Sequence, residues 1–198
     1  IPENLDKKLV DETITRCPNK KISLKMEEMI LDLKEKGDSV GGKVTCIIEN
    51  CPIGLGEPVF DKTEALLAQA MMSIPATKGF EIGSGFSCIE QNGSQHNDAW
   101  IKEDEKIRTK TNNNGGIIGG ITNGENINLS VAFKPPATIL MDQETINLNG
   151  DNVTLKAKGR HDPCVVPRAV PIVEAMAAVV IVDLLLAQIA RKNRFNLL

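Results

Sequence analysis

Apolar residues recur at helical spacing in two stretches of the first half of the chain. The spacing predicts a core-facing helix over residues 23–36, which begins at Ser23 as N-cap, ends at Gly37 and turns inward Met26, Met29, Ile30 and Leu33. Asp61 and Glu64 form a capping-box pattern that opens a second helix, which ends near Pro75 and turns inward Leu67, Ala70, Met71 and Ile74.

A third helix is expected over residues 167–192, where nearly every position is apolar. Its length would suit a membrane span, but Glu174 and Asp183 stand nine positions apart and therefore on opposite faces. Charges in lipid are costly, so the pattern favours a buried helix between two protein layers over a membrane anchor.

Short β-prone runs separate these helices. Strands are expected at 43–49 and within 79–89, with a turn-rich ordered loop at 51–58. An Asn-Gly pair between apolar runs is a strong hairpin signal. The pair at 123–124 predicts a hairpin from 115–122 to 128–134, and the pair at 149–150 predicts a second one within 146–156.

Residues 91–114 are polar, rich in Asn and Lys, and lack apolar periodicity. They predict a mobile loop within one domain, because the patterned segments on either side are too short to bury cores alone. With helices and strands in no regular βαβ alternation, the fold class is predicted to be α+β, with a helical layer between two sheets. The single domain is expected to span 1–198.

Composition narrows the function classes. The chain has 198 residues, of which 41% are hydrophobic and 25% charged, with a net charge of -3, which is typical of a soluble globular domain and gives no reason to expect nucleic acid or membrane as partner. Aromatic residues make up 3%, too few for a base-stacking platform. Five cysteines form no CxxC pair and no metal-ligand cluster, which favours a reducing compartment and hence the cytoplasm.

Two glycine motifs resemble phosphate-binding loops without meeting their requirements. The run from Gly37 to Lys43 lacks the hydroxyl of a P-loop and lies between a helix and a strand, in the reverse of the required order. The glycines of 115–120 have no βαβ unit and no ribose-binding carboxylate. They indicate either hairpin geometry or close approach of backbone to a ligand. His96, in the polar segment, is expected to be solvated.

The segment 160–164 places a cation, an imidazole and a carboxylate at the start of the last helix. Pro163 disfavours helix for Asp162, so that carboxylate lies on a fixed entry segment. The cluster indicates either a structural cap with a salt bridge or a site that uses the carboxylate as a base. Lys134–Thr138 adds a cation, two prolines and a hydroxyl, which fits an anion-holding loop or an edge-strand turn.

Taken together, these segments resemble the chorismate synthase family. Residues 160–176, RHDPCVVPRAVPIVEAM, are similar to the family's C-terminal signature along their whole length. Four further segments follow the family's order: DSVGG at 38–42, PIGLG at 52–56, IPATKGFEIG at 74–83 and NNGGIIGGI at 113–121.

The resemblance implies a lyase that converts 5-enolpyruvylshikimate 3-phosphate to chorismate and phosphate by 1,4-elimination. It implies reduced FMN as cofactor, NADPH as a candidate reductant, a β-α-β sandwich fold and a homotetramer. Asp162 would work with flavin N5 to take the proton. Flavin contacts would be Pro75, Ala76, Gly119, Lys134, Pro135, Pro136, Ala137, Thr138 and Arg160. Ala137 departs from the family's usual hydroxyl residue, so Thr138 is the better candidate contact.

The family's N-terminal histidine motif, second histidine and arginine-rich phosphate site have no counterpart in these residues. The resemblance therefore implies the C-terminal half of a family chain, which alone is expected to be inactive. The alternative is a non-catalytic flavin- or phosphate-binding module, or an assembly fragment.

Overall fold

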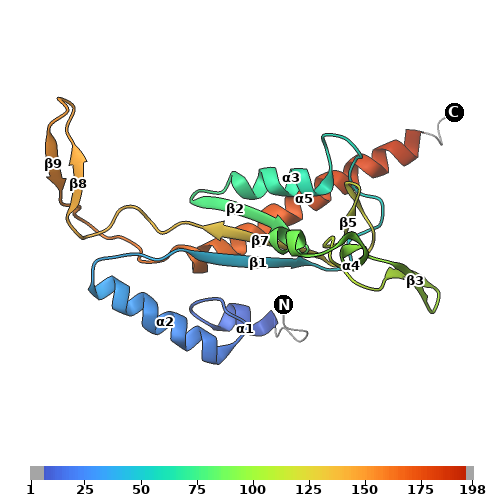
Figure 1. The fold of residues 1–198 in the computed structure, drawn as a ribbon, viewed down its shortest axis with the longest axis horizontal. Helices are drawn as coiled ribbons and strands as arrows, with labels where there is room; N and C mark the ends of the chain where they lie inside the picture. The colour runs from blue at the N-terminus through green and yellow to red at the C-terminus, as the bar shows by residue number, and fades with distance from the viewer. Residues whose placement is uncertain (1–6, 195–198) are drawn as a thin grey trace. The chain divides into compact units, whose positions relative to one another are not determined.

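The computed structural model describes residues 7–194 (Figure 1). The chain forms two compact units: unit 1 combines 1–42 with 133–170, and unit 2 combines 43–132 with 171–198. Helices and small antiparallel sheets together confirm the predicted α+β class. The prediction of one domain over 1–198 stays a prediction, and its two ends lie outside the described residues.

Unit 1 begins with α1 (Lys7–Glu12) and α2 (Lys20–Glu35). The N-cap of α2 is Asn19, whose side chain accepts a hydrogen bond from the Ile22 amide at 3.1 Å. The predicted cap, Ser23, is instead buried inside the helix and shares a 2.7 Å hydrogen bond with the hydroxyl of Thr15. Gly37, at φ +71°, ends the helix as predicted, because few other residues adopt that backbone.

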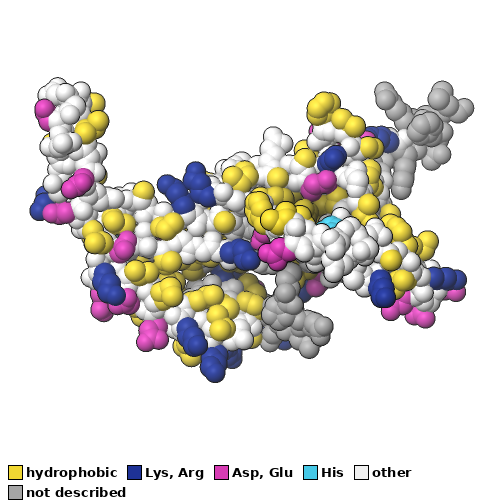
Figure 2. Space-filling view, viewed as in Figure 1, with side chains coloured by type: hydrophobic (Ala, Val, Ile, Leu, Met, Phe, Trp, Pro, Cys, Tyr) yellow, Lys and Arg dark blue, Asp and Glu magenta, His cyan; other side chains and the backbone are white. Residues whose placement is uncertain are grey.

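Much of the apolar surface of α2 is left uncovered by the described residues. Met29 is 56% exposed, and Leu24, Met26 and Leu31 are exposed as well. Figure 2 shows yellow side chains gathered over this helix. Within the described residues, the predicted inward orientation is therefore wrong for Met26 and Met29, whereas Ile30 and Leu33 are half-buried and the helical periodicity is correct.

A hairpin of β8 (Gln143–Ile146) and β9 (Asn152–Leu155) completes unit 1. The strands pair antiparallel with Ile146 opposite Asn152. The Asn147 side chain accepts from the amides of Asn149 and Asp151, and Gly150 adopts φ +88°. This turn confirms the hairpin predicted from the Asn-Gly pair.

Unit 2 is built on a three-stranded sheet in the order β1 (Gly42–Ile48), β7 (Ile127–Phe133), β2 (Thr77–Ile82). The central strand β7 buries every second side chain: Ile127, Leu129, Val131 and Phe133. Helix α3 (Thr63–Met72) packs beside β2 and buries Leu67 and Met71 fully (Figure 1).

The start of α3 differs from its prediction. Its N-cap is Lys62, and no side chain caps it, so the expected capping box of Asp61 and Glu64 is wrong. Instead, the buried hydroxyl of Thr63 donates to the Leu55 carbonyl at 2.9 Å, which ties the helix to the loop at 51–58.

The glycine-rich hairpin turns earlier than predicted. β5 (Ile117–Ile118) pairs with β6 (Ile121–Thr122), and Gly119 and Gly120 form the turn at φ +63° and +92°. The predicted turn at Asn123–Gly124 is wrong, because β7 pairs with β1 and β2. Similarly, η1 (Gly85–Glu90) follows β2, where the sequence predicted further strand.

The segment 91–114 is structured where the sequence predicted a loop. It holds α4 (Gly93–His96) and a hairpin of β3 (Trp100–Glu103) with β4 (Lys106–Thr109). These strands are short and rich in charged residues, so periodicity did not reveal them. The mobility of the segment stays a prediction.

The last helix, α5 (Val166–Arg194), confirms the predicted helix. It buries one stripe, made of Ala169, Val173, Ala177 and Leu184, whereas Val179 is 64% exposed. Among the described residues, the expectation of a helix buried between two protein layers is met along this one stripe only. The helix is long and apolar enough to cross a membrane by length and composition alone, which is weak evidence in either direction.

Candidate functional site

In unit 1, one loop joins the two segments that the sequence selected. The loop 38–41 follows α2. Its Ser39 hydroxyl donates to the Pro136 carbonyl at 2.7 Å, and its Val40 amide donates to the Pro163 carbonyl at 2.8 Å. A side chain at Gly41 would collide with the carbonyl of Phe133, so glycine permits this close approach. The loop thus fixes Lys134–Thr138 and 160–163 to a common support.

Asp162 forms a two-pronged ion pair with Arg168 in the first turn of α5. The guanidinium nitrogens lie 2.8 and 3.1 Å from the two carboxylate oxygens. The Asp162 side chain is 33% exposed and that of Arg168 is 67% exposed. Such a pair adds little stability at a solvated surface, but its fork geometry orients the carboxylate. The salt bridge that the first of the two sequence interpretations predicted is therefore present, and the Asp162 carboxylate is still partly accessible to solvent.

His161 adds an unusual group beside this carboxylate. Its Nε2 atom is buried and has no hydrogen-bond partner. Buried polar atoms are nearly always paired, so an orphaned imidazole nitrogen marks a place where a ligand group or water fits. Arg160, two residues before Asp162, is exposed.

Lys134–Thr138 runs without regular structure after β7. Lys134, Pro135, Ala137 and Thr138 are exposed, and Pro136 is half-buried. The ammonium and the hydroxyl are thus free of core packing, which fits both an anion-holding loop and a turn with a solvated lysine.

In unit 2, the predicted contacts lie at two turns. Pro75 and Ala76 connect α3 to β2, and Ala76 adopts φ +69°, an uncommon backbone for alanine. Gly119 lies in the β5–β6 turn, is exposed, and has open space where a side chain would be. Pro75 and Gly119 are therefore exposed at these turns, whereas Ala76 is half-buried.

Gly119 also lines a groove of about 570 Å³ in unit 2. The groove has apolar walls that include Phe80, Ile82 and Ile117. Pro75 and Ala76 do not line it. The predicted contacts of unit 2 are thus not gathered in one pocket.

The polar end of the groove holds a hydroxyl–imidazole pair. The hydroxyl of Ser84 lies 2.9 Å from Nε2 of His96. His96 is therefore not simply solvated, as the sequence suggested, but half-buried and hydrogen-bonded. A turn at 111–114 supplies the neighbouring wall through Asn113 and Asn114.

The sequence missed Asp98, the carboxylate that organises this turn. It is 3% exposed and accepts four hydrogen bonds, from the Thr111 hydroxyl, the Asn113 amide, and both the amide and the side chain of Asn114. Burial alone would raise the pKa of Asp98, but these bonds together lower it. The run of three asparagines at 112–114, which needs acceptors to fold as a turn, was the available signal.

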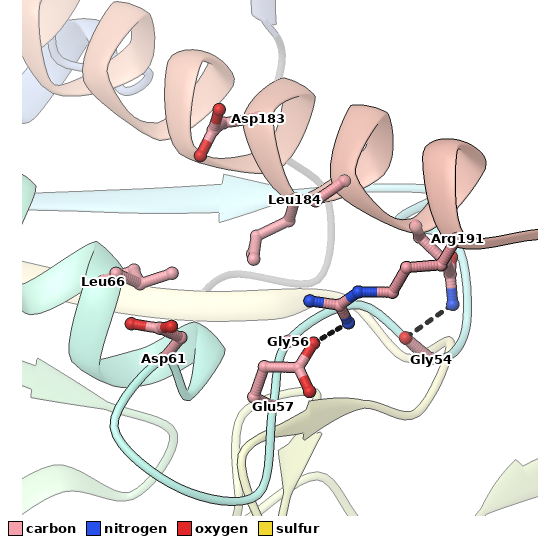
Figure 3. Close-up of a pocket in the computed structure, with 10 residues that line it drawn as sticks. Gly54, Gly56, Glu57, Asp61, Leu66, Asp183, Leu184 and Arg191 are labelled. Atoms are coloured by element: carbon pink, nitrogen blue, oxygen red, sulfur yellow. Dashed lines mark hydrogen bonds and ion pairs between the residues drawn. The ribbon is translucent and has the colours of Figure 1, made fainter. Parts of the chain in front are cut away.

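A second hollow of about 240 Å³ lies between α5 and the loop after β1 (Figure 3). There Arg191 forms an ion pair with Glu57, and the Gln188 side chain donates to the Gly54 carbonyl at 2.7 Å. These contacts anchor the second half of α5 to unit 2. Within the described part of the chain, no group of three metal-ligating side chains occurs.

The arrangement in unit 1 can do a specific kind of chemistry. It holds an accessible carboxylate oriented by a guanidinium, an unpaired imidazole nitrogen, and a cationic loop fixed to the same support. Such a set suits proton transfer on a small anionic molecule.

Comparisons with known proteins identify the family of this chain. The family model described as chorismate synthase matches residues 3–186, and the chain belongs to this family. A chorismate synthase from Prochlorococcus marinus (strain AS9601) is 57% identical over 196 residues, which cover 98% of this chain and 54% of that protein. One from Cytophaga hutchinsonii is 59% identical over 174 residues, or 87% of this chain and 48% of that protein.

A solved structure titled "Crystal Structure of Chorismate Synthase" matches with a TM-score of 0.74 and 34% identity, covering 91% of this chain and 47% of that one. The chain therefore spans about half the length of the relatives it matches. The expectation that it corresponds to the C-terminal half stays a prediction.

Proposed function

We propose that this chain forms part of an enzyme that converts 5-enolpyruvylshikimate 3-phosphate to chorismate and phosphate. In this 1,4-elimination a ring C–H bond and the C–O bond to phosphate break, a new double bond forms, and substrate and products are at the same overall oxidation level. The observation that carries the proposal is the common support of unit 1, which fixes the cationic loop and the Asp162 segment together. Family membership supplies the reaction.

Asp162 is the proposed base that accepts the ring proton. Pro163 keeps it on a non-helical entry segment, and Arg168 holds both carboxylate oxygens. A base fixed from two sides loses less entropy on reaching the productive geometry than one on a free loop.

The residues present fit reduced FMN, which supplies an electron-rich ring when bound. Unit 1 would contribute the charges of Lys134 and Arg160 and the Thr138 hydroxyl, while the orphaned His161 nitrogen offers a hydrogen-bond partner. The family resemblance also names Pro75, Ala76 and Gly119, of which Pro75 and Gly119 are exposed and Ala76 is half-buried. With 3% aromatic residues, this chain would hold a flavin by backbone and charge rather than by stacked rings.

Several finer features belong to the same proposal. We infer a homotetramer in the cytoplasm, with NADPH as a candidate reductant of the flavin. Because the chain spans about half of its relatives' length, we propose that turnover requires the complete gene product and that these residues alone are inactive. The same coverage favours a second candidate, a flavin- or phosphate-binding module without catalysis.

The test of the base uses the complete gene product with reduced FMN and substrate under anaerobic conditions. Asp162→Asn should lower kcat at least about 100-fold, the range of an acid–base group, while flavin affinity stays within about twofold. Asp142→Asn is the matched control, because Asp142 also pairs with a cation in unit 1, Lys156, at 3.0 Å. Equal turnover in both variants would refute the role of Asp162.

The test of the flavin contact compares two glycines. Gly119 and Gly150 both have positive φ and open space at the would-be side chain, so alanine costs a similar backbone strain at each, about 1–2 kcal/mol. Gly119→Ala should weaken FMN binding and Gly150→Ala should not, as measured by calorimetry. The module hypothesis predicts FMN binding by residues 1–198 alone, and a flat titration would count against it.

A further inference from the structure

Asp98 is not among the site residues that the sequence selected, yet it holds the backbone that leads to Gly119. Its Oδ1 accepts from the Thr111 hydroxyl at 2.7 Å and from the Asn113 amide at 2.8 Å. Its Oδ2 accepts from the Asn114 amide and from the Asn114 side chain, both at 2.8 Å. One buried carboxylate thus uses both oxygens to hold a whole turn.

Hydrogen bonds connect this turn to the base of the β5–β6 hairpin. The Asn112 side chain accepts from the Gly116 amide at 2.7 Å, and the Gly116 carbonyl accepts from the Asn123 amide at 3.0 Å. These bonds join the turn to the first residue before β5 and the first residue after β6. The base of the hairpin whose tip is Gly119 is therefore set by the asparagine turn.

The same turn shapes the polar end of the groove. The Asn113 carbonyl accepts from the Ser84 amide at 2.7 Å, and the Asn113 side chain donates to the His96 carbonyl at 3.0 Å. The Ser84–His96 pair and Gly119 line one groove. Asp98 bonds Asn113, which contacts both Ser84 and His96. It also bonds Thr111, so both chain neighbours of Asn112, whose side chain holds Gly116, are fixed by Asp98.

The geometry points to Asp98 as a positioning residue for ligand binding at the Gly119 turn and the adjoining groove. This inference rests on the proposed function, in which Gly119 contacts FMN. Asp98 itself touches none of the proposed ligand atoms. It acts through the asparagine turn, which orders backbone that would otherwise sample many conformations.

Asp98→Asn is the sharpest perturbation, because it changes the volume hardly at all. An amide has one oxygen, so its NH₂ group must face the donors at either Oδ1 or Oδ2. Each oxygen accepts from one backbone amide, of Asn113 or Asn114, and a backbone N–H cannot accept in turn, so at least one hydrogen bond of the turn is lost. The control is Val131→Ala, which removes core packing in β7 without touching the turn.

The experiment uses the complete gene product and measures calorimetric FMN affinity, kcat and KM, and amide hydrogen exchange at 112–116. Asp98→Asn should raise the FMN Kd at least about tenfold and lower kcat by up to about 100-fold, since small misplacements can cost that much. It should also speed exchange in the turn. Val131→Ala should lower resistance to urea but leave the FMN Kd and the flavin absorption spectrum of the bound state unchanged.

The outcomes separate the two proposals. If the wild-type protein binds no FMN, the proposed function fails and the inference built on it is overturned as well. If the wild type binds FMN and Asp98→Asn binds it equally well, the positioning role alone is refuted. If Val131→Ala weakens FMN binding as much as Asp98→Asn does, global stability explains the effect and the inference is again overturned.

Discussion

The ion pair between Arg108 and Glu125 gives the most sharply calculable stability prediction. Glu125 is 8% exposed, and its two carboxylate oxygens accept from the Arg108 guanidinium at 2.6 and 2.7 Å. One of them also accepts from the Thr109 amide at 3.1 Å. Glu125→Ala therefore removes all three bonds that tie the β3–β4 hairpin to the chain before β7.

The expected loss in the free energy of unfolding is the sum of what Thr109 and Arg108 lose in the Glu125→Ala variant. The Thr109 amide forfeits its acceptor, which costs about 1 kcal/mol. The Arg108 side chain is 42% exposed and can be rehydrated, so its two charged bonds contribute about 1–2 kcal/mol together rather than their full value. The total loss is about 2–3 kcal/mol, or roughly 4–12 °C in Tm for a chain of this size.

The assay uses the single tryptophan of the chain. Trp100 lies opposite Thr109 in the hairpin register, so its fluorescence in a urea titration reports this region. Lys156→Met, which breaks an exposed ion pair with Asp142, is the control and should cost less than about 1 kcal/mol. A loss below about 0.5 kcal/mol for Glu125→Ala, or strict additivity with Arg108→Met in a double-mutant cycle, would refute the reasoning.

Acid should weaken the same contact. The hydrogen bonds from the Arg108 guanidinium, which outweigh the effect of burial, hold the pKa of Glu125 below its ordinary value. A carboxylate with a lowered folded pKa contributes stability that is complete above its unfolded pKa, about 4.3, and is lost as pH falls through the folded value. The stability difference between wild type and Glu125→Gln should therefore shrink below about pH 4, and a constant difference would contradict this account.

Two further predictions concern glycines and thiols. Gly56→Ala should lower the free energy of unfolding by about 2 kcal/mol or more, because Gly56 adopts φ +98° and the new methyl group would collide with the Thr63 hydroxyl. Gly93→Ala has open space around the new methyl group in α4 and should be neutral or stabilising. Urea unfolding midpoints of the two variants would show the contrast. Burial, aided by the charge of Glu174, raises the pKa of Cys46 to about 11. A time course of alkylation at pH 8, followed by mass spectrometry, should therefore label the exposed Cys88 before Cys46. Equal labelling of the two thiols in the folded protein would be inconsistent with the burial of Cys46.

Local patterns predicted much of the fold. The α2 and α5 helices follow from apolar spacing, and the β8–β9 hairpin follows from its Asn-Gly pair, because these signals act within a few residues. Pairings between distant residues were beyond such signals. The central place of β7 depends on β1 and β2, which lie far away in the chain, so the turn was predicted at Asn123–Gly124 instead of Gly119–Gly120.

Some residues of the candidate site could likewise be predicted from local sequence, and others could not. Residue chemistry and family resemblance selected Asp162 and Lys134–Thr138, and the structure shows how loop 38–41 supports both segments. Asp98 was missed because its four hydrogen bonds come from residues 13 to 16 positions later, and a lone aspartate in a polar stretch carries no periodic signal.

Because α5 buries only one stripe, its remaining apolar surface affects the solubility of residues 1–198. Ile172, Val179, Val182, Leu186 and Ile189 remain in contact with water, and a net charge of -3 gives little mutual repulsion between copies. As acid neutralises the remaining excess of carboxylates, that repulsion disappears while the apolar surface stays. Residues 1–198 prepared by themselves should thus be most soluble at mildly alkaline pH, and light scattering should rise as the buffer is acidified.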